Sequence, residues 1–523
     1  MNRTLHWVVG GMAVLGLTLP AQALNDSTTE HGIDARRLHA PPYNLTGKKV
    51  AIGQVEIGRP SKFGLDKVPP KRRIVHVAGV FYRDQPARSE DHVDNHAELV
   101  AAVMVSQDKH LQGVAPDANL YASAVGPASQ VAECLAAQHV AQQQNNTVRA
   151  INFSFGEPLR RDERSNPVLD GNALLSRCVD WSARVHNTLY VIAGNQGGGG
   201  IQLPTDHYNG ITVAATRRWD GEFAKLSFSN LSALPEGIGR TLILQEINQG
   251  SRRAISLVAP GGGINLYTSS GKIRPISGTS FAAPHVTATV AVLQELSDRR
   301  LGQARWGEAA QRQEVMKAVL LNAADKVKDP GDGRYLGMLR TILGKNHENW
   351  LDGDAFRNTT TPLDIQLGTG QLNAYRAYQQ FEAGQWQAGE TVPAIAWAYD
   401  TVTSGSAQDY VLEAPLQGGS FASVSLAWQR QVLLRDRNGN GQFDEDETFQ
   451  DRGLNDLNLY LLPAEANDVR QSVCASNSAV DSVEHFFCEV PRTGRYKIRV
   501  VYDQQLNDPE QAYGLAWWTV AAQ

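Results

Sequence analysis

Short apolar runs alternate with amphipathic segments over about 250 residues in the first part of the chain. The apolar runs have the length of buried strands, and the segments between them carry apolar residues at helical spacing, as at Leu99, Val100 and Val103. This alternation predicts a parallel sheet wrapped by helices, a three-layer α/β fold whose active groups gather at the carboxyl ends of the strands. The expected strands cover residues 49–58, 74–80, 119–125, 149–156 and 189–195, and the expected helices cover 98–104, 131–143 and 174–186.

The pattern changes near residue 392. Before it lies a predicted helix at 313–324, and after it come short alternating strands separated by turns, such as 424–428, 457–461 and 496–500. Regularly spaced short strands of this kind are typical of an all-β sandwich. We therefore expect an α/β domain at 47–385 and a β-sandwich domain at 392–523. Residues 24–46 form an extension too short to bury a core of its own.

The first 23 residues have the pattern of a secretory signal peptide. Arg3 supplies the positive charge, residues 5–19 are mostly apolar, and Ala21-Gln22-Ala23 is a small-x-small cleavage signal. The apolar run is short for a membrane anchor, and no other stretch approaches membrane length. We expect cleavage after Ala23, a secreted or periplasmic protein, and no membrane contact after cleavage.

Composition narrows the class of partner. A chain of 523 residues is too long for one ordinary core, so two or more domains are expected. The net charge of −5 is small for this length, and no basic patch or acidic tail stands out. Nucleic acid is therefore not an expected partner.

Four cysteines are present, and an exported protein can oxidise them. Four cysteines allow three pairings, which the sequence alone does not decide, and four buried thiols are the alternative. Because each pair falls within one expected domain, we favour the disulfides Cys134–Cys178 and Cys474–Cys488.

The most informative stretch is residues 276–293. Gly278 gives a permissive backbone before a helix start, Thr279 or Ser280 can cap that helix, and uncharged small and apolar residues follow as far as Leu293. Pro284 is tolerable early in the helix. The serine would lie at the positive end of a buried helix, where an alkoxide or a nearby oxyanion gains stabilisation. Residues 276–286 closely resemble the nucleophile motif of subtilisin-like serine peptidases, and the resemblance implies that Ser280 is the nucleophile.

The same resemblance implies a histidine base. Residues 93–102 resemble the family's histidine-bearing helix start, and residues 111–116 resemble the segment that follows it, which points to His96. Residues 97–99 depart from the usual pattern. His92 and His110 are competitors, but neither precedes an Ala/Val helix at the family's spacing.

The orienting acid is unusual. At the end of the first strand, where the family has aspartate, this chain has Glu56, in Val55-Glu56-Ile57-Gly58. Glutamate can still accept the histidine N–H, since the role is orientation and charge stabilisation. Asp66 and Asp94 are rival acids.

Two further roles follow from the resemblance. Residues 191–195 resemble the strand that presents an asparagine amide to the oxyanion, so Asn195 is expected to donate together with the Ser280 N–H. Residues 151–156 resemble the edge strand that pairs with the substrate backbone, which implies substrate-binding roles for Ser154, Phe155 and Gly156.

A separate motif stands in the expected β domain. Residues 436–447 fit the twelve-residue calcium loop, with oxygen-bearing side chains at positions 1, 3, 5, 9 and 12 and glycine at position 6. Flanking helices are missing, and an acidic turn is the alternative. We expect a structural Ca²⁺ ion held by Asp436, Asn438, Asn440, Gln442 (through its backbone carbonyl), Asp444 and Glu447.

Together these features predict a secreted subtilisin-like serine endopeptidase with a Glu-His-Ser triad, acting on peptide or protein substrates as a monomer. The β-sandwich domain resembles the jelly-roll domains often appended to such enzymes. The family commonly has a folded propeptide, for which 24–46 is too short, so the chain folds unaided or with another helper. The alternatives are a catalytically impaired relative that acts as a binding module, and a structural protein whose catalytic half displays the β domain.

Overall fold

A mostly parallel sheet forms the centre of the N-terminal part of the molecule. In the computed structural model the described residues are 24–522, apart from 128, 195–201, 220, 227–229, 232–246, 249–251 and 269–270. Within these residues the sheet has ten strands in the order β16-β10-β9-β7-β5-β1-β4-β2-β3, with β13 also paired to β9. The strands are β1 (Ala51–Glu56), β2 (Val77–Tyr82), β3 (Gln85–Pro86), β4 (Asn119–Ala124), β5 (Val148–Phe153), β7 (Leu189–Ala193), β9 (Ile211–Trp219), β10 (Glu222–Lys225), β13 (Leu257–Pro260) and β16 (Ile342–Leu343).

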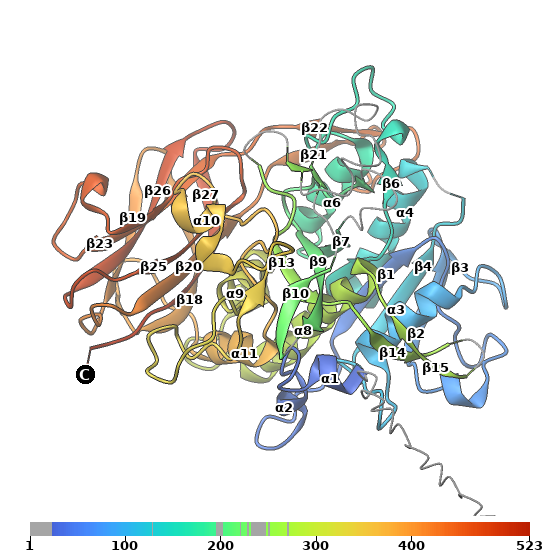
Figure 1. Ribbon diagram of the computed structural model, residues 1–523. Helices are drawn as coiled ribbons and strands as arrows, with labels where there is room; N and C mark the ends of the chain where they lie inside the picture. Colours follow the sequence, from blue (N-terminus) through green and yellow to red (C-terminus); the bar gives the residue numbers. More distant parts are fainter. Residues whose placement is uncertain are drawn as a thin grey trace, which may run out of the picture.

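Helices cover both faces of this sheet (Figure 1), which confirms the three-layer prediction. On one face lie α3 (Asn95–Val105) and α8 (Thr279–Arg300), and on the other lie α4 (Gln130–Ala141) and α6 (Leu174–Val185). Side chains alternate along each strand, so Ile52 of β1 packs with α3 and α8, whereas Val55 packs with α4 and α6. Residues 54 and 56 therefore share the face of Ile52, toward α3 and α8.

The N-terminal extension is part of the core of this domain. It contains α1 (Leu24–Thr28) and α2 (Arg36–His39). Ile33, Ala35, Leu38 and Leu45 are almost fully buried in the cluster that also contains α3 and α8. The Ser27 hydroxyl lies 2.9 Å from Nε2 of the buried His285 in α8, which ties the extension to the helix that bears Ser280.

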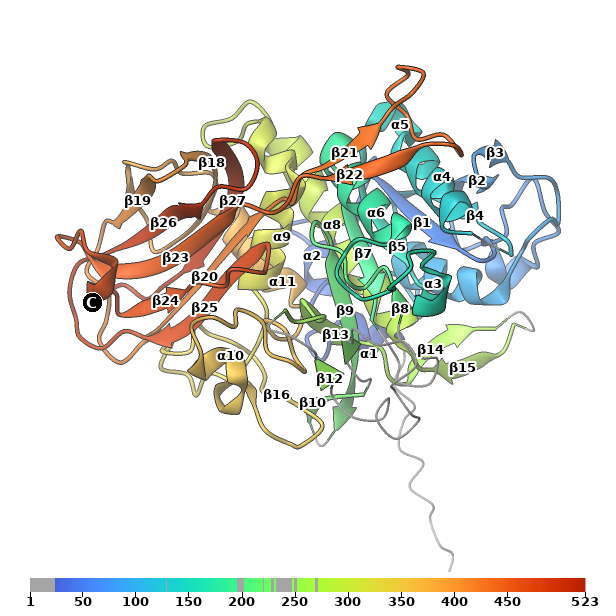
Figure 2. The same ribbon diagram turned by 90° about the horizontal axis from the view of Figure 1, so that it is seen from above.

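Two further sheets face each other in the C-terminal part (Figures 1 and 2) and bury an apolar core between them. One sheet contains β17 (Thr391–Val392), β19 (Ala407–Leu412), β26 (Tyr496–Gln504), β23 (Asp456–Pro463) and β24 (Cys474–Ser476). The other contains β18 (Ile395–Thr403), β27 (Glu510–Trp518), β20 (Phe421–Trp428) and β25 (Val483–Glu489). The pairing is antiparallel except between β17 and β19, so a β-rich region follows the α/β domain as predicted. The jelly-roll topology and the boundaries at 385 and 392 stay predictions.

The sheet that contains β20 is covered on both faces. Its outer face packs on α9 (Gln313–Asn322) and α11 (Ala374–Glu382), and every residue of β20 is buried. The hydroxyls of Ser423 and Ser425 donate to the Asn322 side-chain oxygen of α9, at 2.9 and 3.2 Å. The polar positions of this alternating strand therefore face the α/β domain and not solvent.

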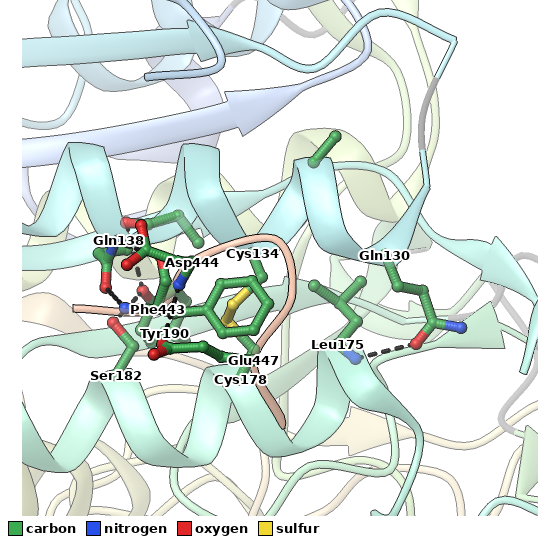
Figure 3. Close-up of a disulfide and its surroundings, with 12 residues drawn as sticks. Gln130, Cys134, Gln138, Leu175, Cys178, Ser182, Tyr190, Phe443, Asp444 and Glu447 are labelled. Carbon is green, nitrogen blue, oxygen red and sulfur yellow. Dashed lines mark hydrogen bonds between the residues drawn. A yellow bond between two sulfur atoms is a disulfide. The ribbon is translucent and has the colours of Figure 1, made fainter. Parts of the chain in front are cut away.

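A two-stranded arm reaches from the sandwich to the α/β domain (Figure 2). It consists of β21 (Val432–Arg435), β22 (Thr448–Asp451) and the loop between them, and its strands pack on α6. Phe443 of the loop is fully buried in one apolar cluster with Trp181, Cys134 and Cys178. Its ring lies against the Cys134–Cys178 disulfide (Figure 3). Gln138 of α4 donates to the Phe443 carbonyl at 3.2 Å and accepts its N–H at 2.6 Å.

Both expected disulfides are present. Cys134–Cys178 joins α4 to α6, and Cys474–Cys488 joins β24 to β25, with Cα atoms 5.8 and 6.3 Å apart. The predicted pairing is therefore confirmed.

The remaining elements are short. Of all helices in the described ranges, none combines the length and the apolar character that crossing a membrane requires. The short elements are α5 (Gln143–Asn146), α10 (Asp354–Arg357), β6 (Glu157–Pro158), β8 (Gln202–Leu203), β11 (Asn230–Leu231), β12 (Ile247–Asn248), β14 (Ile264–Tyr267) and β15 (Ile273–Ile276), with single 3₁₀ turns at Pro70–Arg72, Leu159–Arg161, Glu308–Gln311, Trp350–Asp352 and Val469–Gln471.

Candidate active site

The residues expected to be catalytic come from three elements that meet at the carboxyl ends of the central strands. Glu56 is the last residue of β1, His96 is the second residue of α3, and Ser280 is the second residue of α8. Ser154 follows the last residue of the neighbouring strand β5. Because β1 and β5 are parallel, their carboxyl ends bring these groups to the same edge.

Glu56 and His96 form a direct pair. His96 Nδ1 lies 2.7 Å from Glu56 Oε2, and the Glu56 side chain is 3% exposed whereas that of His96 is 43% exposed. Burial alone would lower the pKa of His96, but the hydrogen bond and the charge of Glu56 outweigh it and raise this pKa above its ordinary value. Burial raises the pKa of Glu56, against the hydrogen bonds from His96 and Gln54, which favour the carboxylate. A carboxylate thus holds the imidazole at Nδ1, and His96 is one of the residues that line the neighbouring cleft.

The rival residues have other roles. Asp66 is paired with the buried Arg59 through two hydrogen bonds of 2.7 and 2.9 Å. Asp94 is the N-cap of α3 and accepts the Ala97 N–H at 3.0 Å. His92 is exposed and its ring stacks on that of Tyr82 at 4.1 Å.

His110 is also exposed, in the segment that follows α3. Of the carboxylates that the sequence left open, the structure brings Glu56 to His96.

The start of α8 differs from the prediction. The N-cap is Gly278, and neither Thr279 nor Ser280 caps the helix. Their hydroxyls are used elsewhere, since Thr279 donates to the Gly194 carbonyl at 2.7 Å and Ser280 donates to the Ser154 carbonyl at 3.2 Å. Both residues bind the carboxyl ends of neighbouring strands, so side-chain capping of the helix by either of them was a wrong prediction.

Pro284 explains a second contact. A proline has no N–H to give to the carbonyl four residues earlier, which here is that of Ser280. The Ser154 hydroxyl donates to this freed carbonyl at 2.9 Å. Asn152 donates in turn to the Ser154 hydroxyl at 2.8 Å, so two β5-derived side chains fix the backbone of the serine.

Ser280 and His96 are neighbours in space but are not hydrogen-bonded to each other. The His96 ring centroid lies 5.6 Å from that of Phe281, the residue after Ser280. Among the described residues, the Ser280 hydroxyl has the Ser154 carbonyl as its hydrogen-bond partner and not the imidazole. Contacts between nucleophile and base are often long in proteins without substrate.

A cleft of about 480 Å³ opens beside the Glu56–His96 pair. Ser154 and Phe155 line it, together with Gly126 and Pro127 at the end of β4. Strand β5, which covers residues 151–153, lies between β1 and β7 and is not an edge strand, whereas Ser154, Phe155 and Gly156 lie beyond its end. Ser154 and Phe155 line the cleft, and the Ser154 carbonyl accepts the Ser280 hydroxyl.

Asn195 lies outside the described residues. The strand before it, β7, ends at Ala193, and Gly194 is held by the Thr279 hydroxyl. The chain therefore leaves β7 directly beside the start of α8.

The predicted calcium loop lies on the two-stranded arm. Asp436 accepts the N–H groups of Gly439 and Gly441 at 2.6 and 2.7 Å, and Asp444 accepts the side-chain amides of Asn438 and Asn440 at 2.7 and 2.9 Å. The Glu447 carboxylate accepts the N–H groups of residues 437 and 444. In the described part of the chain, no group of three or more His, Cys, Asp or Glu side chains is gathered as a metal centre.

Sequence reasoning missed two residues of the site. Gln54 donates to the second Glu56 oxygen at 2.8 Å, and its position two residues earlier in the strand was a signal that it shares the face of Glu56. At Gly58 a Cβ atom would lie 2.3 Å from the Cβ of Asp94, so the strand end approaches the cap of α3 too closely for any side chain.

An α/β fold with a serine at the start of a buried helix and a histidine–carboxylate pair beside it has the parts of a serine hydrolase. The sequence model of the subtilase family matches residues 44–338, more than half of the chain. The chain therefore belongs to the subtilase family.

Individual relatives are distant. Subtilisin Savinase of Lederbergia lenta is 29% identical over 266 residues, which cover 50% of this chain and 82% of that protein. An alkaline protease of Alkalihalobacillus alcalophilus is also 29% identical over 266 residues, but the match spans only 58% of its length. Among solved structures, the prenylagaramide maturation protease PagA is similar, with a TM-score of 0.41 and 20% identity, over 66% of this chain and 98% of that one.

Proposed function

We propose that the protein is a serine endopeptidase that uses Ser280, His96 and Glu56. The observation that carries this proposal is the 2.7 Å contact between Glu56 and His96 Nδ1, beside the N-terminus of the helix that bears Ser280. A carboxylate at Nδ1 keeps the proton on that nitrogen and leaves Nε2 as the base.

In the proposed reaction the Ser280 oxygen attacks the peptide carbonyl carbon while His96 Nε2 takes the hydroxyl proton. The Ser280 N–H and the Asn195 side chain donate to the resulting oxyanion. The peptide C–N bond then breaks, His96 returns the proton to the leaving amine, and an acyl ester remains on Ser280. Water, deprotonated by His96, hydrolyses this ester and frees the enzyme.

Substrate binding is proposed for residues 154–156. All three lie past the end of β5, and Ser154 and Phe155 line the cleft, where an extended peptide can pair with the backbone. Main-chain pairing selects an extended peptide or an unfolded protein segment without demanding one side chain.

A fluorophosphonate probe tests the catalytic proposal. We expect labelling of the wild-type protein and no labelling of Ser280→Ala, with cleavage of unfolded casein lost in the same variant. A wild-type protein that folds but is not labelled at any pH from about 4 to 10, well past the ordinary imidazole pKa, would refute the proposal.

One observation favours an alternative. The Ser280 hydroxyl is bonded to the Ser154 carbonyl and not to His96. If this hydroxyl stays on the carbonyl when a peptide binds, the protein is an impaired subtilase that acts as a binding module. That protein would bind an extended peptide without labelling and without cleavage, and these two results separate the hypotheses.

We also propose that residues 436–447 bind one Ca²⁺ ion. The side chains of Asp436, Asn438, Asn440, Asp444 and Glu447, with the carbonyl of Gln442, offer only oxygen ligands, which is the chemistry that calcium requires. The two asparagines donate their N–H₂ groups to Asp444, so each amide must turn to present its oxygen. Calorimetric titration with Ca²⁺ should show one site, and the double variant D436N/E447Q should lose it. No heat, together with an unchanged melting temperature, contradicts this proposal.

Export is the third proposal. The two disulfides support an oxidising compartment, and residues 1–23, which lie outside the described residues, carry the signal pattern. Mass spectrometry of the exported protein should find Leu24 at its N-terminus, and sedimentation should give the mass of a monomer.

A further inference from the structure

Gln54 lies next to the Glu56–His96 pair on the inner face of β1. Its side chain is 1% exposed, and it points with Ile52 and Glu56 toward α3. Removing an amide from water is costly unless the amide is hydrogen-bonded, so its contacts explain why it is placed there.

The two N–H bonds of the Gln54 amide have separate acceptors. One donates to Glu56 Oε1 at 2.8 Å, and the other donates to the Ala97 carbonyl at 2.9 Å. Ala97 follows His96 directly in α3. One amide group therefore joins the carboxylate to the backbone of the helix that carries the imidazole, while Glu56 Oε2 contacts His96 Nδ1.

The orientation of this amide is fixed by its neighbours. Turned over, it would place its own oxygen against a carboxylate oxygen and a carbonyl oxygen. In the orientation observed, Gln54 Oε1 is buried and has no hydrogen-bond partner among the described residues. An unsatisfied buried acceptor costs about 1–3 kcal/mol. A residue placed here for packing alone would carry no such cost, which points to a role for the two donors.

We propose that Gln54 is a positioning residue for the Glu56–His96 pair. Glutamate has one more rotatable bond than aspartate, so a single contact with the imidazole leaves the carboxylate free to turn. The amide of Gln54 fixes the second oxygen, favours the ionised form of the carboxylate and sets its distance from α3. The kinetic consequence rests on the proposed peptidase function, whereas the consequence for the imidazole does not.

The variants Gln54→Met and Gln54→Glu test this inference in the full-length protein. Methionine has a similar volume and no donor. Glutamate keeps the shape but adds a carboxylate, and it replaces methionine as the test if the methionine variant does not fold. Gln380→Met is the matched control, because Gln380 is also fully buried and donates to two carbonyls, at 3.1 and 3.4 Å, far along the chain from the pair.

The measurement is the titration of the His96 imidazole by NMR with labelled histidine, and a His96→Gln variant assigns the signal. Without the donor, the carboxylate is no longer held against the imidazole, and the hydrogen bond that raises the pKa of His96 weakens. The His96 titration should therefore move down by about one pH unit, as expected for a weakened hydrogen bond to a charged group. In Gln54→Glu two buried carboxyl groups would lie side by side and share one proton, which reduces the negative charge on Glu56 and shifts the titration in the same direction. Asp94, whose charge also raises the pKa of His96, is unchanged in every variant.

Kinetics give the second readout. In Gln54→Met we expect kcat to fall roughly 10–100-fold while KM stays within about 3-fold, since the lost contact orients the base and does not touch substrate. An unchanged His96 titration in both Gln54 variants, or the same shift in Gln380→Met, overturns the inference. A wild-type protein without hydrolysis, but with a His96 titration that responds to Gln54, refutes the peptidase function and leaves the positioning role standing.

Discussion

Phe443 is expected to control access to the Cys134–Cys178 disulfide. Both sulfur-bearing residues are fully buried, and the Phe443 ring covers them from the arm, stacked on Phe449 with ring centroids 5.0 Å apart (Figure 3). Replacing a fully buried phenylalanine by alanine costs about 3–5 kcal/mol. Because Gln138 still holds the backbone of residue 443, we take the lower value of about 3 kcal/mol for the docking of the arm.

This free energy translates into a rate. Each 1.4 kcal/mol is about tenfold in an equilibrium, so Phe443→Ala should raise the population with a lifted arm by roughly 100-fold. When the arm closes faster than a reductant reacts, the rate of reduction follows that population. The assay exposes the folded protein to dithiothreitol, traps free thiols with an alkylating reagent, and counts them by peptide mass spectrometry.

The second disulfide is an internal control. Cys474–Cys488 lies in the β-sandwich, away from the arm, and its reduction should not change. Phe443→Leu, which keeps most of the apolar volume, should accelerate reduction of Cys134–Cys178 much less than the alanine variant. Equal acceleration of both disulfides would indicate global unfolding, and an unchanged rate would mean that the arm does not protect this site. Either result refutes the reasoning.

Three other predictions concern the site and the extension. Glu56→Gln should lower kcat by up to roughly 10⁴, because the amide no longer fixes the tautomer of the imidazole; an effect under about tenfold in steady-state kinetics contradicts this. Since the pKa of His96 is raised and the base must be neutral, kcat/KM should fall with decreasing pH through a midpoint above about 6.5, and in Glu56→Gln the midpoint should move down. Ser27→Ala removes the partner of Nε2 of the buried His285, whose Nδ1 still contacts the Phe281 carbonyl, and should lower the free energy of unfolding by about 1–3 kcal/mol in urea titrations, with the exposed Thr360→Ala as a neutral control.

Much of the α/β fold could be predicted because its signals are local. The apolar runs and the helical spacing indicated β1, β4, α4 and α6 to within a few residues of their bounds. Ser280, His96 and Glu56 were predicted as site residues because each lies in a motif that resembles a known family. The structure places His96 and Glu56 in direct contact, and their catalytic roles stay predictions. Asn195, the expected oxyanion donor, lies outside the described residues.

What the sequence did not reveal depends on partners distant in the chain. A glutamine in a strand has no pattern of its own, so the contacts of Gln54 with Glu56 and α3 appear only in three dimensions. The alternation in residues 424–428 predicted a strand of a β-sandwich, and only the structure shows that the polar side chains of this strand contact Asn322 of α9. The capping role expected for Thr279 failed because a strand-end carbonyl competes for its hydroxyl.

The shared packing of the sandwich on α9 and α11 has a consequence for how such a chain can evolve or be engineered. Each half has apolar residues that only the other half covers. Every residue of β20 is buried, and Trp397 of β18 donates its indole N–H to the Phe381 carbonyl of α11. The α/β half expressed alone would display an apolar patch and would tend to aggregate. If this β-sandwich were transferred to another protein, the helices that contact it there would have to be redesigned to match the faces that α9 and α11 cover here.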